Sequence, residues 1–120
     1  MSDQRRSNNE IDQMISTYRD SPELLSEIFA IFLDEAPRRL QALQQAAAQR
    51  DFDSARRAAH SLANTTGTLR ADDALKAARA AESAARSADG AGLEQAVGDL
   101  VQAVGEVVAA IEAYRSGAVD

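Results

Sequence analysis

The sequence predicts an all-α protein, an antiparallel up-down-up-down four-helix bundle with a short additional N-terminal helix. Apolar residues recur every three or four positions through four long segments, which is the period of an amphipathic helix. The breaks between these segments are short, and short connections make consecutive helices antiparallel neighbours. Apolar residues make up 45% of the chain but aromatic residues only 4%, so the core is alanine-rich and aliphatic, which favours helices over strands.

A short helix near residues 11–18 and a long second helix come first. Ser21 and Pro22 predict the start of the second helix, because serine is a preferred N-cap and proline suits the first helical position. Pro37 is expected to kink this helix without ending it, since the apolar seam keeps its phase on both sides. The apolar positions of the two helices are Ile11, Met14, Ile15 and Tyr18, then Leu25, Phe29, Phe32, Ala36, Leu40, Leu43 and Ala47.

Three further helices follow, separated by breaks at residues 49–51, near 70–73 and at 89–92. Asp51 or its neighbour is expected to cap the first of them, and Asp72 and Asp73 the second. Asp89 to Gly92 predicts a turn before the last helix. These breaks favour an intramolecular bundle over a coiled-coil dimer. The predicted inner faces carry Phe52, Ala55, Ala59, Leu62, Thr66 and Leu69, then Ala74, Ala78, Ala81 and Ala85, then Leu93, Val97, Leu100, Val104, Val107, Ile111 and Tyr114.

Length and composition limit the domain organisation and the partners. We expect one helical domain at residues 10–116, a disordered N-terminus at 1–9 and a frayed C-terminus at 117–120. A net charge of −6 argues against a nucleic-acid partner. No apolar stretch approaches the ~18 residues of a membrane span, and no signal core is present. The absence of cysteine is compatible with the cytoplasm, where we expect a monomer without a metal site or cofactor.

His60 is the only histidine of the chain. At about 100° per residue it falls about 120° from the centre of the apolar stripe of its helix, so we expect it to face solvent. No carboxylate stands three or four residues away, and no nucleophile is placed for a hydrolase triad. Two interpretations remain, a solvated bystander or a neutral imidazole that attacks directly as a nucleophile.

The surroundings of His60 suit a phosphoryl group. The residues that we expect beside it are Arg56, Arg57, Ala63, Asn64 and Gly67. The two arginines would place positive charge one turn away, and the small residues on the other side leave the ring open to a broad partner. On the second helix, Leu24, Ile28 and Ile31 widen the apolar stripe. They lie either under the short first helix or on an exposed docking surface.

Most of the chain, from about Ser21 to Arg115, carries segments in a distinctive order and spacing. They are Ser21-Pro22-Glu23-Leu24-Leu25, Ile28-Phe29, Phe32-Leu33-Asp34-Glu35-Ala36-Pro37-Arg38-Arg39-Leu40, and Asp51-Phe52 with Ala55-Arg56-Arg57-Ala58-Ala59-His60-Ser61-Leu62. This arrangement resembles a histidine phosphotransfer (HPt) domain of a bacterial two-component phosphorelay. Ala71 and Glu82 also fall where that family commonly has Ala and Glu.

The resemblance implies that His60 takes a phosphoryl group on its outer ring nitrogen. The donor is a receiver-domain aspartyl phosphate or a hybrid histidine kinase, and the acceptor is a response regulator. The chain is then a stoichiometric phosphocarrier and not an enzyme, because the receiver supplies the magnesium ion and most of the transition-state stabilisation. Docking of the receiver is expected on Leu24, Ile28 and Ile31.

The chain departs from the family pattern after the histidine, where His-x-Leu-Lys-Gly is common. Ala63 replaces the lysine and Asn64 the glycine, and a later family glycine is Arg70. Asn64 either donates a hydrogen bond to the phosphoryl group or is a plain solvated residue. The alternative function is a non-phosphorylated helical adaptor, a pseudo-HPt domain. The phosphoacceptor region of a histidine kinase is less consistent, since Ser61 stands where that class has an acidic residue.

Overall fold

The computed structural model describes residues 11–117, and every regular element in that range is a helix. A short first helix at residues 11–17 precedes four long helices, α2 (Pro22–Ala48), α3 (Phe52–Thr68), α4 (Asp72–Arg86) and α5 (Gly90–Arg115). The predicted all-α class is therefore confirmed. The N-terminus expected to be disordered, residues 1–9, lies outside the described residues, as do residues 118–120 of the C-terminus.

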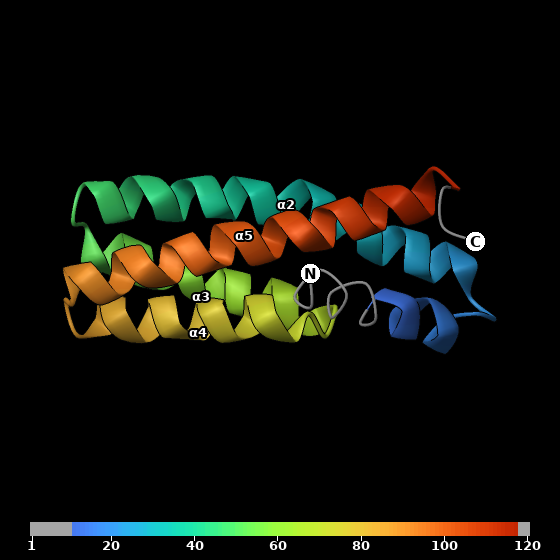
Figure 1. The fold of residues 1–120 in the computed structure, drawn as a ribbon, viewed down its shortest axis with the longest axis horizontal. Coiled ribbons are helices and arrows are strands. Elements are labelled where there is room, and N and C mark those ends of the chain that lie inside the picture. Colours follow the sequence, from blue (N-terminus) through green and yellow to red (C-terminus); the bar gives the residue numbers. More distant parts are fainter. Residues whose placement is uncertain (1–10, 118–120) are drawn as a thin grey trace.

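The four long helices form an antiparallel bundle. Consecutive helices run in opposite directions, and the short first helix lies at the end of the bundle where α2 begins and α5 ends (Figure 1). Each long helix contacts the next one, and α5 contacts α2, which closes the bundle. This is the predicted up-down-up-down arrangement. Pro37 lies inside a continuous α2, so the expectation that it does not end the helix is confirmed.

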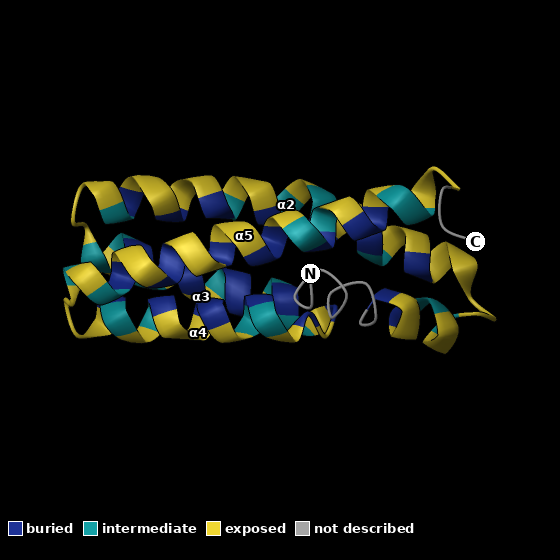
Figure 2. Cartoon of the chain, in the orientation of Figure 1, coloured by how far each residue is buried: buried dark blue, intermediate teal, exposed yellow. Residues whose placement is uncertain are grey.

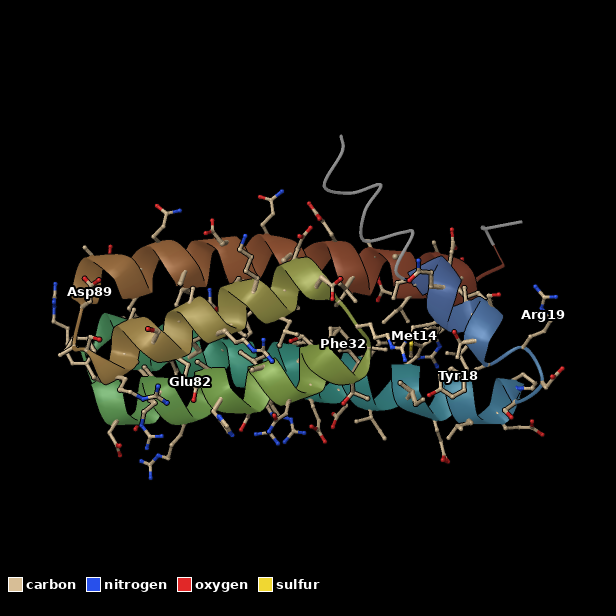
Figure 3. The ribbon with its side chains drawn as sticks, turned by 90° about the horizontal axis from the view of Figure 1, so that it is seen from below. Met14, Tyr18, Arg19, Phe32, Glu82 and Asp89 are labelled. Carbon is tan, nitrogen blue, oxygen red and sulfur yellow. The ribbon has the colours of Figure 1, made fainter. Side chains whose placement is uncertain are left out.

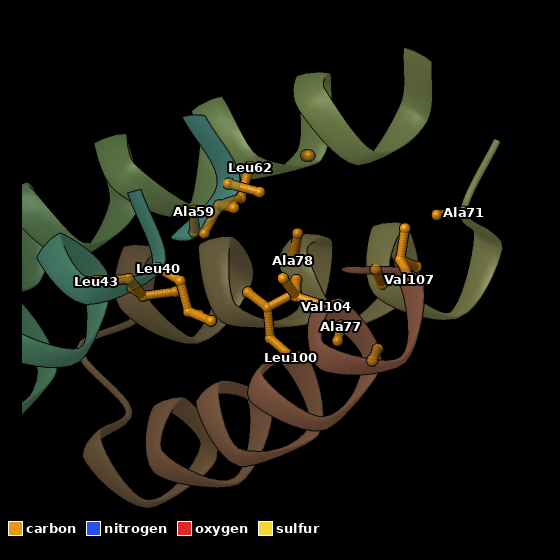
Figure 4. Packing of buried hydrophobic residues seen from close by; sticks show 14 of the residues in the cluster. Leu40, Leu43, Ala59, Leu62, Ala71, Ala77, Ala78, Leu100, Val104 and Val107 are labelled. Atoms are coloured by element: carbon orange, nitrogen blue, oxygen red, sulfur yellow. The ribbon is translucent and has the colours of Figure 1, made fainter. Parts of the chain in front are cut away.

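The buried faces of the helices meet along the middle of the bundle (Figure 2). α2 and α5 contribute large side chains. The rings of Phe29 and Tyr114 pack edge to face, with their centroids 5.7 Å apart. α4 differs, because every residue that it buries is an alanine. Figure 4 shows Ala59 and Leu62 of α3 in the same packed cluster as Ala78 of α4. Small contact residues let helix axes approach closely, so α3 and α4 pack tightly against each other.

Asp51 caps α3 as predicted. Its carboxylate accepts hydrogen bonds from the backbone N–H of Ser54 at 3.2 Å and from the Ser54 hydroxyl at 2.8 Å. These two bonds, with the charge of Arg57 nearby, hold the pKa of Asp51 below its ordinary value of 3.8. The ionised cap satisfies one of the backbone donors that the first turn of a helix leaves without partners.

Ser21 is the N-cap of α2 and Pro22 its first residue, as predicted, but the starts of α4 and α5 differ from the prediction. Ala71 is the N-cap of α4 and makes no side-chain cap bond, so Asp72 and Asp73 lie in the first turn and not at the cap. There they favour the helix through its dipole. Asp89 caps α5 by accepting from the backbone N–H of Gly92 at 3.0 Å. The predicted turn is therefore shorter, and the residues after Asp89 already belong to the helix.

Val104→Asp is expected to unfold the protein. Val104 is buried in α5, and a carboxylate there has no partner to offset the loss of hydration, at a cost of several kcal/mol. Circular dichroism should show loss of helix at 25 °C. Val101→Asp is the matched control, because Val101 lies on the same helix and is exposed. A folded Val104→Asp variant with unchanged melting temperature would contradict this core.

Candidate functional site

His60 lies in the middle of α3 with its side chain 60% exposed. The residues that precede and follow it on the inner side, Ala59 and Leu62, are fully buried. The outward orientation predicted from the helical period is therefore confirmed. An imidazole in this position can be approached by another macromolecule without any opening of the bundle.

The carboxylate of Glu82, on α4, contacts the ring of His60. Its Oε2 lies 3.0 Å from His60 Nδ1, and the Glu82 side chain is only 15% exposed. The same oxygen accepts a hydrogen bond from Arg86 Nη2 at 3.2 Å. Figure 3 shows Glu82 where α4 runs alongside α3. The site therefore combines an imidazole, a carboxylate and a guanidinium drawn from two helices.

The contact with Glu82 assigns different roles to the two ring nitrogens. A carboxylate only accepts hydrogen bonds, so in the neutral ring the proton is held on Nδ1. The lone pair then resides on Nε2, the outer nitrogen. A hydrogen-bonded carboxylate also fixes the orientation of the ring. In the tautomer with the proton on Nδ1, the nitrogen that carries the lone pair is the one that does not contact Glu82.

Sequence spacing alone did not reveal this contact. Glu82 is separated from His60 by 22 positions and lies on another helix. A carboxylate at that separation cannot be found from the residues three or four positions away from the histidine. The only signal was the resemblance, in which Glu82 matched a common family residue. Arg86 had no such signal, because its role depends on where α4 lies.

Arg56 and Arg57, predicted to neighbour the phosphoryl group, both bind Asp53. Arg56 Nη2 lies 3.3 Å and Arg57 Nη2 3.1 Å from its carboxylate oxygens. Side chains on a helix lean toward its N-terminus, so both arginines point back toward Asp53 and away from His60. They are within one turn of the histidine, as predicted, but their charge is directed toward the start of α3.

The predicted neighbours on the other side of His60 lie in three different environments. Ala63, one turn after His60, was expected to line the exposed side of the imidazole. It is instead buried in the core. Gly67 lies about two turns from His60 and faces Leu75 of α4, which a Cβ at this glycine would meet at 3.7 Å. Asn64 is exposed one turn after His60, in the position that the sequence predicted.

The apolar surface of α2 remains open. Leu24 and Ile31 are 47% and 54% exposed, so the short first helix does not cover them, and Ile28 is partly buried. Beside them a groove of about 200 Å³ runs between α2 and α3. Its lining residues are Ile28, Ile31, Phe32, Glu35, Asn64, Thr65, Thr68 and Leu69. Asn64 lines this groove and lies one turn after His60 on α3, so the groove comes within one helical turn of the histidine, which does not line it.

Comparison with known proteins identifies the family. A family model described as Hpt domain matches residues 27–116, which include α3, α4 and both members of the His60–Glu82 pair. The chain belongs to the Hpt domain family. The segment from Ser21 to Leu25 precedes the matched region. No curated protein and no solved structure matches the chain.

Membership of this family indicates a histidine phosphotransfer role in phosphorelays. Hpt domains are phosphocarriers and not catalytic enzymes, and they interact with receiver domains and kinases. Among residues 11–117, no helix is long and apolar enough to cross a membrane. Within the same residues, no cluster of histidine and acidic side chains is arranged to hold a metal ion.

Glu82→Ala is expected to change the tautomer of His60. In the parent protein, ¹⁵N NMR of the neutral imidazole should show the proton on Nδ1, because Glu82 accepts it. Removal of this acceptor should shift the population toward the Nε2–H form, with helicity unchanged. Glu94→Ala, which removes a carboxylate from the exposed side of α5, is the control. An unchanged tautomer in Glu82→Ala would show that the carboxylate does not orient the ring.

Proposed function

We propose that His60 accepts a phosphoryl group from a receiver-domain aspartyl phosphate, or from a hybrid kinase, and passes it to a response regulator. The observation that carries this proposal is the exposed imidazole whose Nδ1 faces the carboxylate of Glu82 at 3.0 Å. An imidazole held in this way presents an unprotonated Nε2 to an incoming partner. The carboxylate comes from a second helix and its side chain is only 15% exposed, so the contact is held by the packing of α3 against α4.

The proposed step is an in-line displacement at phosphorus. The lone pair of His60 Nε2 forms the new N–P bond while the bond from phosphorus to the aspartyl oxygen breaks, and that carboxylate leaves with the electron pair. The proton stays on Nδ1, where the positive charge that develops on the ring is stabilised by Glu82. The reverse step returns the phosphoryl group to an aspartate. The receiver contributes the magnesium ion, which the family resemblance implies.

The partner is proposed to dock on α2 and on the groove beside it. Leu24, Ile28 and Ile31 provide an apolar patch of the kind that marks protein interaction sites. Asn64 connects the groove to the imidazole, so a partner seated there reaches His60 with its own active site. We also propose that Asn64 donates a hydrogen bond to the phosphoryl group, which its exposure one turn after His60 supports. Transient signalling contacts of this sort are small.

A second candidate, an adaptor that binds a receiver without transfer, is favoured by one observation. Position 63, where the family commonly has lysine, is a buried alanine, so α3 places no charge directly after His60. In an adaptor the apolar patch would bind the partner and the imidazole would have no part in the outcome. The two functions therefore differ in whether His60 is needed.

Phosphoryl transfer should require His60. A radiolabelled phosphoreceiver from the same organism should label the parent protein and not His60→Gln. The label should be stable in alkali and labile in acid, as expected for a phosphoramidate bond. Because the glutamine side chain retains polarity at an exposed site, the fold and receiver binding should be unchanged. Equal binding of the receiver by both proteins, with neither labelled, would establish the adaptor.

Ile31→Glu should slow transfer by reducing docking. A charge in the centre of the apolar patch is left desolvated when the partner binds, at a cost of roughly 1–3 kcal/mol, which corresponds to about 5- to 150-fold in the docking equilibrium. Val101→Glu is the matched control, because Val101 is the exposed large aliphatic residue of α5. Both variants should keep their helicity. Equal transfer rates for the two would place docking elsewhere.

A further inference from the structure

We propose that Ala63 is a positioning residue for His60. Its small side chain keeps α3 and α4 close enough for the carboxylate of Glu82 to reach His60 Nδ1. The consequence for phosphoryl transfer rests on the proposed phosphocarrier function, whereas the position of the proton on the ring does not. The family commonly has lysine at position 63, so the inference assigns a use to the residue that replaces it.

Two contacts fix how α3 and α4 are aligned. His60 of α3 contacts Glu82 of α4 at 3.0 Å, and a Cβ at Gly67 of α3 would meet Leu75 of α4 at 3.7 Å. The two contacts are seven residues apart on each helix, in opposite directions, so they belong to one antiparallel register. Seven residues are about two turns, so both contacts lie on the same face of each helix.

Ala63 lies in the middle of this interface between α3 and α4. It follows His60 by three residues and precedes Gly67 by four, which are the spacings of neighbours on one helix face. It is only 9% exposed. The same argument places Ala78, which is fully buried, one turn before Glu82 on α4. The register therefore sets two alanines opposite each other, one turn from the contact between the imidazole and the carboxylate.

A larger side chain at position 63 should break the contact between His60 and Glu82. Helix axes lie about 8 to 10 Å apart, depending on the side chains between them, and alanine favours the short end of that range. Glu82 Oε2 lies 3.0 Å from the ring, and a hydrogen bond is lost beyond about 3.5 Å. The Glu82 side chain is mostly sheltered, so it has little freedom to follow the ring when the helices separate.

The first test measures the tautomer of neutral His60 by ¹⁵N NMR in a graded series at position 63. Ala63→Ser adds a single oxygen atom and should keep the proton on Nδ1, as in the parent. Ala63→Val and Ala63→Leu should move the proton progressively toward Nε2, because Glu82 is withdrawn. Valine adds less volume, so it keeps the test valid if leucine overpacks the core and unfolds the protein. Ala46→Leu is the matched control, because Ala46 is also buried but lies on α2.

Phosphorylation of the same variants by potassium phosphoramidate measures what the contact contributes to transfer, and it needs no partner protein. His60 Nε2 forms an N–P bond, the P–N bond of phosphoramidate breaks, and ammonia leaves with the electron pair. The initial rate, followed by ³¹P NMR, should fall about tenfold in Ala63→Leu, which is the effect of one charge-assisted hydrogen bond. Ala63→Ser should retain most of the rate, and Ala46→Leu should react like the parent.

A double-mutant cycle tests whether position 63 acts through Glu82. In a Glu82→Ala background the acceptor is already absent, so Ala63→Leu should change neither the tautomer nor the rate any further. A further loss of rate in that background would overturn the inference. A parent-like tautomer in the folded members of the pair Ala63→Val and Ala63→Leu would also overturn it, as would an equal change of tautomer in Ala46→Leu.

Failure of the phosphocarrier proposal gives a different result. If neither the parent protein nor His60→Gln takes up a phosphoryl group, His60 is not a phosphoacceptor, and the tautomers still decide whether Ala63 positions Glu82. If the parent is phosphorylated and the tautomer stays constant through the series, only the role of Ala63 is lost. Helicity measured on every variant confirms that the spectra and rates refer to folded protein.

Discussion

The contact between His60 and Glu82 exists because α3 and α4 pack closely, and the rest of the site depends on it. α4 buries only alanine, and helix axes come nearer as the residues between them become smaller. A glutamate on α4 can then reach the ring on α3 while its own chain is mostly sheltered. A larger side chain at Ala78 or Ala81 would move α4 outward and withdraw Glu82. The composition of the core therefore controls which side chain contacts an exposed residue.

The bundle divides its tasks among the helices. α2 provides the apolar patch, α3 the imidazole that we propose as the nucleophile, and α4 the carboxylate and the guanidinium that adjoin it. The groove between α2 and α3 includes Asn64, which lies one turn after His60, so the proposed docking surface lies close to the imidazole. α5 closes the bundle from the other side, and its buried valines and leucines keep α2 and α4 in place.

Predictions that depend on local chemistry were the most accurate. The outward position of His60, the continuity of α2 through Pro37 and the cap at Asp51 each follow from a few neighbouring residues and the period of a helix. Prediction was poorer at the starts of α4 and α5, where several residues compete for the cap and backbone geometry decides. Arg70 also shows that backbone geometry decides at the start of α4. Its φ of 56° is a left-handed conformation, which favours glycine. Glycine is the residue common in the family at this position.

The sequence by itself determined the helical fold, the inward and outward faces of each helix, and the outward position of its single histidine, the proposed nucleophile. These properties repeat with the helical period, so they can be read from one segment at a time. Only the tertiary structure decided what stands beside that nucleophile. It directed Arg56 and Arg57 toward Asp53, buried Ala63, and brought Glu82 and Arg86 to the imidazole from a different helix. The physical reason is that distances between helices depend on packing of the whole core, which no single segment encodes.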